Sequence, residues 1–133
     1  MSTTIGPYSP VVCAGPWRIC SGQLGLAPHP DGSGALALVE GGAEAELNTA
    51  LANAEELLIG VGASLRHVVK TTVFLVTMDN YAAVNTAYTR AFSYHRPARS
   101  LVAVCCLPMG AAVEVELWAY VPEADTPAAG AEA

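Results

Sequence analysis

The sequence predicts one α+β domain in which two amphipathic helices cover one face of a single mixed β-sheet. Residues 42–61 repeat apolar side chains at helical spacing, and residues 113–121 alternate strictly between apolar and polar side chains. Residues 67–77 are rich in β-branched side chains, which is typical of a strand. The expected order is two or three strands, a helix, a strand, a second helix and two strands, and this order fits a two-layer fold.

The N-terminal part predicts a hairpin followed by a long loop. Residues 5–10 read as a turn, and residues 11–14 and 17–21 read as two short strands around Gly15 and Pro16. Residues 23–34 are rich in Gly and Pro and are expected to form a loop. Residues 35–39 could then form a brief edge strand.

Both helices carry sequence signals at their ends. In residues 42–61, Glu44 and Glu46 are expected in the first turn, where they favour the positive end of the helix dipole. Gly60 and Gly62 mark the end of that helix. Asp79 can cap the second helix, which is expected to reach about residue 92 because Pro97 bars its continuation.

The remaining strands carry the candidate chemistry. Residues 67–77 and 99–106 are apolar on both alternating faces, which predicts strands covered on both sides. Residues 107–110 then break the chain, and the strand at 113–121 has one apolar face with Glu114 and Glu116 on the other. If the last two strands pair antiparallel, Arg99 and these carboxylates could face a common cleft.

Composition favours self-association. The 133 residues are 53% hydrophobic and only 14% charged, about ten points below a typical soluble domain. Two helices leave the opposite sheet face uncovered, so copies of the chain are expected to cover it. We expect one domain at residues 1–121 and a disordered tail at 122–133, which lacks bulky apolar residues.

Several functional classes are disfavoured by composition. The net charge is −6 and the six basic residues form no cluster, so nucleic acid is not an expected partner. The sequence lacks a long apolar run and a signal peptide, which predicts a cytosolic protein without a membrane span. His, Cys and Gly spacings match neither a metal site nor a nucleotide-binding loop, and the four cysteines are expected to be buried free thiols.

Taken alone, Arg99 would more often be a structural ion pair than a ligand-binding residue, and the two glutamates would more often be an exposed strand face. A set of motifs over residues 5–120 changes these odds. They are, in order, Ile5-Gly6-Pro7-Tyr8-Ser9, Ser21-Gly22-Gln23, Asn53, Val69-Lys70-Thr71-Thr72-Val73-Phe74, Val84-Asn85 with Tyr88, Pro97-Ala98-Arg99-Ser100, Leu107-Pro108 and Glu114-Val115-Glu116. In this order and spacing the sequence resembles the reactive intermediate deaminase (Rid) family of imine deaminases.

The resemblance implies a chorismate-mutase-like fold of the bacillus type, whose sheets line a trimeric barrel with three sites in the clefts between subunits. It implies that Arg99 grips the substrate carboxylate and that Glu114 positions and activates water. Tyr8, Ser21 and Gly22 match positions that line the pocket.

Two further positions follow from the same resemblance. Leu101 stands where the best-known deaminases have Cys, and this position is expected to contact ligand through its backbone N–H. Asn85 matches a recurrent helix position with an expected structural role.

The expected function is hydrolysis of 2-imino or enamine acids, such as 2-aminoacrylate and 2-iminopropanoate, to 2-keto acids and ammonia. No cofactor or metal is expected, because a protonated imine carbon is already electrophilic and needs only water and proton transfer. Two rival hypotheses are a non-catalytic protein that senses small carboxylates and an RNA-cleaving translation inhibitor. Arg99 and Glu114 together favour the enzyme, and the acidic composition disfavours RNA.

Overall fold

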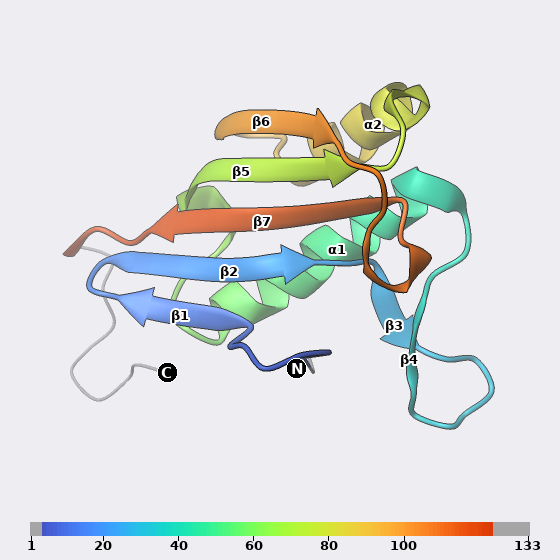
Figure 1. Cartoon of the computed structure of the whole chain (residues 1–133). Helices are drawn as coiled ribbons and strands as arrows, with labels where there is room; N and C mark the ends of the chain where they lie inside the picture. Colours follow the sequence, from blue (N-terminus) through green and yellow to red (C-terminus); the bar gives the residue numbers. More distant parts are fainter. Residues whose placement is uncertain (1–3, 124–133) are drawn as a thin grey trace.

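The structure, a computed structural model, describes residues 4–123 and has two helices packed on a mixed five-stranded sheet (Figure 1). The sheet order is β1-β2-β7-β5-β6, and a separate two-stranded ribbon is formed by β3 and β4. The strands are β1 Val11–Ala14, β2 Trp17–Gln23, β3 Leu26–Pro28, β4 Leu36–Leu38, β5 Val68–Leu75, β6 Ala98–Ala103 and β7 Val113–Tyr120. The helices are α1 Gly42–Ile59 and α2 Tyr81–Ala91.

The core lies between the helices and one face of the sheet. Both helices lie on the same side of the sheet in Figure 1. Val113, Val115 and Leu117 of β7 are fully buried, as are Leu47 and Leu58 of α1. The alternation along β7 therefore predicted the buried face correctly, and the α+β class with two helices on one sheet face is confirmed.

The expected pairing of the last two strands is wrong. β6 pairs parallel with β5, whereas β7 pairs antiparallel with β5 on its other side. Parallel neighbours need a crossover connection, and α2 supplies it between β5 and β6. A 3₁₀ turn, Pro108–Gly110, then precedes β7. β5 thus separates Arg99 from Glu114 and Glu116.

The face of the sheet that the helices leave open is partly apolar. Trp118 and Tyr120 of β7 are 40% and 42% exposed, and Val102 of β6 is 44% exposed. The expectation that β5 and β6 are covered on both faces is therefore wrong for a single chain. Covering of this face by further copies of the chain stays a prediction, as do the trimer and its barrel.

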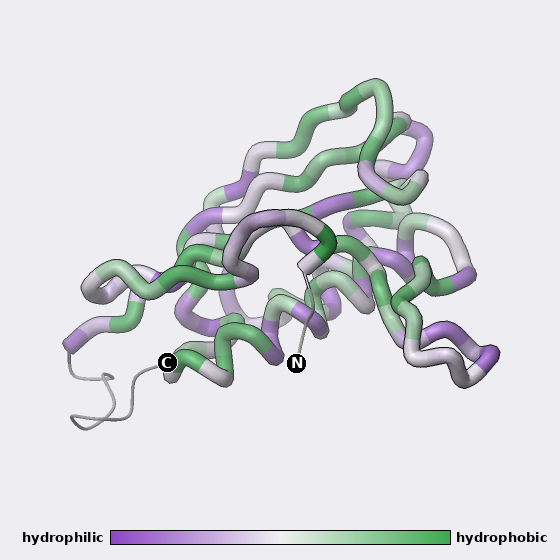
Figure 2. Tube along the Cα trace, turned by 60° about the horizontal axis from the view of Figure 1, so that its bottom comes forward, coloured by the Kyte–Doolittle hydropathy of each residue, from purple (hydrophilic) through white to green (hydrophobic). Residues whose placement is uncertain are grey.

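The predicted loop 23–34 contains a strand. β3 and β4 pair antiparallel, with Pro28 opposite Leu36, and the connection between them is hydrophilic (Figure 2). Two contacts attach this ribbon to α1. The amide of Asn53 donates hydrogen bonds to the carbonyl oxygens of Leu24 and Leu26, and Gly25 packs against the backbone of α1.

The helix ends differ from expectation in two details. The first turn of α1 contains Glu44 but not Glu46. Glu46 is buried, and its Oε1 accepts a hydrogen bond from the backbone N–H of Ala112 at 2.9 Å. Thr77 rather than Asp79 caps the segment before α2, since the Thr77 hydroxyl accepts from the Asp79 N–H. An unexpected hydrogen bond lies just after the end of α1. The Nε of buried Arg18 donates to the carbonyl oxygen of Val61 at 2.8 Å.

The cysteine prediction is partly wrong. All four thiols are free, as expected, but only Cys20 is buried, while Cys13, Cys105 and Cys106 are exposed.

Neither helix between residues 4 and 123 has the length and apolar character that crossing a bilayer requires. The expected tail lies almost wholly outside the described residues, and the cytosolic location stays a prediction.

Gly25, the residue before β3, should not tolerate a side chain because it packs directly against the backbone of α1. A Cβ there would lie 2.5 Å from the carbonyl oxygen of Glu46. We expect Gly25→Ala to lower the free energy of unfolding by about 1–3 kcal/mol, the usual cost of overpacking. Urea denaturation followed by circular dichroism measures this change. Gly60→Ala is the matched control, because its Cβ meets atoms only at 3.4 Å or beyond; equal stability of both variants would contradict the packing argument.

Candidate functional site

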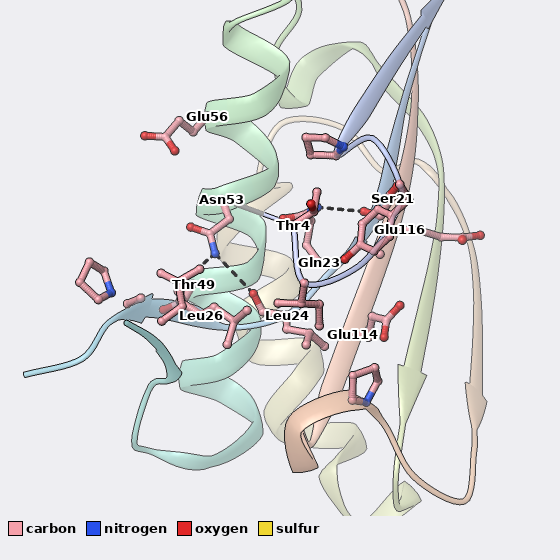
Figure 3. Close-up of a pocket in the computed structure, with 18 residues that line it drawn as sticks. Thr4, Ser21, Gln23, Leu24, Leu26, Thr49, Asn53, Glu56, Glu114 and Glu116 are labelled. Carbon is pink, nitrogen blue, oxygen red and sulfur yellow. Dashed lines mark hydrogen bonds between the residues drawn. The ribbon is translucent and has the colours of Figure 1, made fainter. Parts of the chain in front are cut away.

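A cavity of about 760 Å³ lies between β2, β7, α1 and the β3–β4 ribbon. Figure 3 shows Glu114 and Glu116 on the β7 side, Asn53 on the α1 side, and Gln23 and Leu24 between them. The residues that line it are Thr4, Ile5, Tyr8, Pro10, Ser21, Gly22, Gln23, Leu24, Leu26, Ala27, Pro28, Leu36, Thr49, Asn53, Glu56, Pro108, Glu114 and Glu116.

Glu114 reaches the cavity because β2 is irregular beside it. Regular pairing of β2 with β7 stops after Cys20 and resumes at Gln23, so residues 21 and 22 leave the ladder. A Cβ on Gly22 would overlap the carboxylate of Glu114. Glycine at this position therefore creates the space that the carboxylate occupies.

The environment of Glu114 favours its protonated form. Burial removes water from the carboxylate and raises its pKa above the ordinary value of 4.5, and the neighbouring charge of Glu116 raises the pKa further. A carboxyl group with a raised pKa in a cavity is a candidate for general acid–base chemistry.

Ser21 connects the cavity wall to the N-terminal segment. Its hydroxyl donates to the carbonyl oxygen of Ser9 at 2.7 Å, and its N–H donates to that of Pro10 at 2.9 Å. The Gln23 amide in turn donates to the Ser21 carbonyl oxygen at 3.0 Å. These bonds hold the segment that carries Tyr8 against β2, so the structure brings Tyr8, Ser21, Gly22 and Glu114 together at one cavity.

Arg99 lies on the other face of the sheet. Its Nη1 donates to Oδ1 of Asn85 on α2 at 2.9 Å, and its Cζ stands 4.8 Å from the centre of the Tyr88 ring. Leu101, two residues along β6, packs against the core on this same side. Within one chain, therefore, Arg99 and Leu101 do not share a cleft with Glu114, and the conditional expectation of a common cleft is wrong at this level.

The structure adds residues that the sequence alone did not single out as pocket-lining. Pro108 and Gln23 belong to motifs already noted, whereas Thr49 and Glu56 carried no signal, because their positions on α1 read as ordinary helix surface. The lining contains three carboxylates and no Lys or Arg. Among residues 4–123, no cluster of three or more His, Cys, Asp or Glu side chains could hold a metal ion.

Comparison with known proteins places the chain in a family. The model of the family described as Endoribonuclease L-PSP matches residues 2–121. The 2-iminobutanoate/2-iminopropanoate deaminase of Mus musculus is 42% identical over 112 residues, which are 84% of this chain and 79% of that protein.

Solved structures agree with this placement. RidA from a Psychrobacter species superposes with a TM-score of 0.80 at 33% identity, over 90% of this chain and 92% of that one. Escherichia coli TdcF with bound serine superposes with a TM-score of 0.77 at 28% identity, over 90% and 91% of the two chains. The chain therefore belongs to the Endoribonuclease L-PSP family, the family that contains the Rid proteins.

Proposed function

We propose that this protein is a deaminase that hydrolyses 2-imino or enamine acids to 2-keto acids and ammonia. The name of the Mus musculus relative supports this reaction, and TdcF with bound serine supports a small amino-acid-like ligand. Glu114 in the cavity beside Gly22 supports acid–base chemistry at this site.

The main support for a site shared between subunits is the separation of charges within one chain. The cavity is lined by carboxylates, whereas Arg99 lies on the opposite face of the sheet. A carboxylate substrate needs a cation, and Arg99 is the side chain whose planar fork suits it. A neighbouring subunit can supply Arg99 if its edge strand β6 packs beside this cavity, because Arg99 is only partly buried on that strand. The proposed site therefore lies between subunits of a homotrimer.

The chemistry follows from these groups. Arg99 of one subunit binds the substrate carboxylate and places the protonated imine carbon over Glu114 of the next. Glu114 orients water and takes its proton as the water oxygen attacks the carbon. The same carboxyl group returns the proton to nitrogen. The carbon–nitrogen bond then breaks as the new hydroxyl group gives its proton to the Glu114 carboxylate, so ammonia leaves and the 2-keto acid remains. The raised pKa of Glu114 suits this exchange, because it moves the group toward neutral pH.

The two rival functions have less support. RNA cleavage needs cations along the bound phosphates, and the lining of this cavity has none. A sensor of small carboxylates would use the same Arg99, but the sensor hypothesis does not explain why the partly buried carboxylate of Glu114 would lie beside the ligand. Release of ammonia by the wild-type protein in the assay below separates an enzyme from a sensor.

Subunit complementation tests the shared site. Arg99→Lys keeps the charge and loses the fork, so deamination should fall by about tenfold or more. Glu114→Gln should lose more of the deamination activity than Arg99→Lys. When the two variants are unfolded together and refolded at equal amounts, random trimers should regain about a quarter of the wild-type sites, because some sites draw both native residues from different chains.

Light scattering should first give a mass of about 41 kDa, three times the chain mass of 13.7 kDa, as expected for a trimer. Each variant refolded alone is the control. A mixed sample no more active than the average of the two controls would exclude a site shared between subunits.

The two glutamates should differ in activity. Glu114→Gln keeps the size of the side chain and removes the proton acceptor, so turnover should drop by about 10²–10⁴-fold while 2-keto acids still bind. Glu116→Gln should cost much less. Steady-state release of ammonia from imines generated by an amino-acid oxidase measures both. If Glu116→Gln is the impaired variant, or if neither variant is impaired, the catalytic carboxylate is misassigned; a wild-type protein that binds 2-keto acids but releases no ammonia is a sensor.

Glu114 should also limit stability at neutral pH. Since the folded pKa is raised, folding favours the protonated form, and this contribution is complete below the unfolded pKa and lost as pH rises through the folded pKa. Glu114→Gln should therefore have a higher Tm than wild type at pH 7, with the difference vanishing near pH 4. Thermal melts across this range measure it, with exposed Glu40→Gln as control. A lower Tm for Glu114→Gln at pH 7 would refute the assigned direction.

A further inference from the structure

The guanidinium of Arg99 is held in place by its own chain before any ligand arrives. Arg99 lies on β6, the edge strand of the sheet (Figure 1), and is only partly buried. In the register of β6 with β5 it stands opposite Thr71, so the two side chains share one face of the sheet. A long side chain at an edge loses entropy when a ligand fixes it, so contacts that fix it beforehand favour binding.

The ring of Tyr88 on α2 lies against the guanidinium. Cζ of Arg99 is 4.8 Å from the centre of this ring, within the range of about 6 Å for a cation–π interaction. The ring is itself fixed at two points. The Tyr88 hydroxyl is hydrogen-bonded to Oγ1 of Thr71 at 2.8 Å, and its ring centre lies 4.8 Å from that of Phe92. Thr71 and Tyr88 are both buried, so β5, α2 and β6 are joined by one closed set of contacts.

These contacts leave one edge of the guanidinium available to a ligand. Nη1 of Arg99 donates to Oδ1 of Asn85 at 2.9 Å. Within residues 4–123, its Nε and Nη2 make no hydrogen bond. These two nitrogens carry parallel N–H donors, the arrangement that both oxygens of a carboxylate can accept. The Tyr88 ring thus sets the plane of the fork, and Asn85 sets its rotation within that plane.

Tyr88 is not suited to proton transfer. Burial raises the pKa of its hydroxyl above the ordinary value of 10.0, although the hydrogen bond with Thr71 and the charges of Arg99 and Arg96 act in the opposite direction. The phenol therefore stays neutral at neutral pH. A neutral ring keeps the negative π-face that attracts a guanidinium.

We propose that Tyr88 and Thr71 are positioning residues for the carboxylate-binding fork of Arg99. The ring of Tyr88 orients the fork, and Thr71 holds the ring. The proposal rests on the proposed function, since it concerns how the substrate carboxylate is bound. A Tyr88 that only packed α2 on the sheet would not affect which ligands bind.

The preference for a carboxylate over an amide tests the orientation of the fork. The four-carbon 2-keto acid and its primary amide have nearly the same shape, but only the acid is an anion that both N–H donors can hold. Calorimetry on the wild-type protein should show tighter binding of the acid. Tyr88→Leu should weaken binding of the acid by about tenfold and leave that of the amide unchanged, because the guanidinium loses its support. Equal losses for both ligands, no loss for either, or no preference for the acid in wild type would overturn the proposal.

Matched variants separate the ring from the hydroxyl. Tyr88→Phe keeps the ring and should lose about threefold or less in affinity for the acid, and Thr71→Val should behave alike. Tyr94→Phe is the control, because it removes the same hydroxyl from a fully exposed ring; it should bind both ligands as wild type does. A Tyr88→Phe variant as impaired as Tyr88→Leu would show that the ring does not orient Arg99, and would overturn the proposal.

A double-mutant comparison tests whether Tyr88 acts through Arg99. Adding Arg99→Lys to Tyr88→Leu should cause little further loss of acid affinity beyond that of Arg99→Lys alone, because both changes remove the same interaction. Losses that add in full would overturn the proposal. Tyr88→Leu leaves the buried Thr71 hydroxyl without its partner; if that variant does not fold, Thr71→Val/Tyr88→Leu removes the unpaired group and replaces it in every measurement.

Failure of this proposal and failure of the proposed function give different results. Release of ammonia by the wild-type protein, together with unchanged acid affinity in Tyr88→Leu, would remove the positioning role and leave the reaction. Selective loss of acid affinity in Tyr88→Leu, without release of ammonia by the wild-type protein, would support the positioning role and remove the reaction.

Discussion

The alternation of side chains along β7 is the constraint on which the rest of the structure depends. One set, including Val113, Val115 and Leu117, is fully buried under the helices. The other set, including Glu114, must then lie on the face that no helix covers. A one-residue slip would place carboxylates in the core, so the same pattern fixes the register and presents Glu114 at the cavity.

Strand order adds a second constraint. β5 lies between β6 and β7, and Arg99 shares its side of the sheet with Leu101, which packs on the core. Arg99 and Glu114 therefore point to opposite faces, and no side-chain rotation within one chain can unite them. If both act on one substrate, they come from different chains. The open apolar face and the incomplete site are then two consequences of one architecture.

The sequence predicted which side chains share a face but not which strands are neighbours. Helical spacing and the alternation at β7 depend on local geometry, so both helices and the dry face were predictable. The position of β6 depends on a crossover through α2, and the β3 strand is three residues long within a Gly- and Pro-rich segment, so neither left a periodic signal. The family resemblance predicted Tyr8, Ser21 and Gly22 as pocket-lining; it could not reveal Thr49 or Glu56, which reach the cavity only through packing of α1.

Burial of Glu114 joins stability to chemistry. Gly22 leaves room for the carboxylate, and desolvation raises its pKa, so an ionised Glu114 costs folding free energy at neutral pH. In the proposed trimer, a neighbour's face would bury Glu114 further and raise the pKa more, while the guanidinium of its Arg99 would act in the opposite direction. In that trimer, a bound substrate carboxylate would neutralise the guanidinium and restore the higher pKa. Substrate binding would thereby make Glu114 a better proton acceptor at the moment when water must be activated.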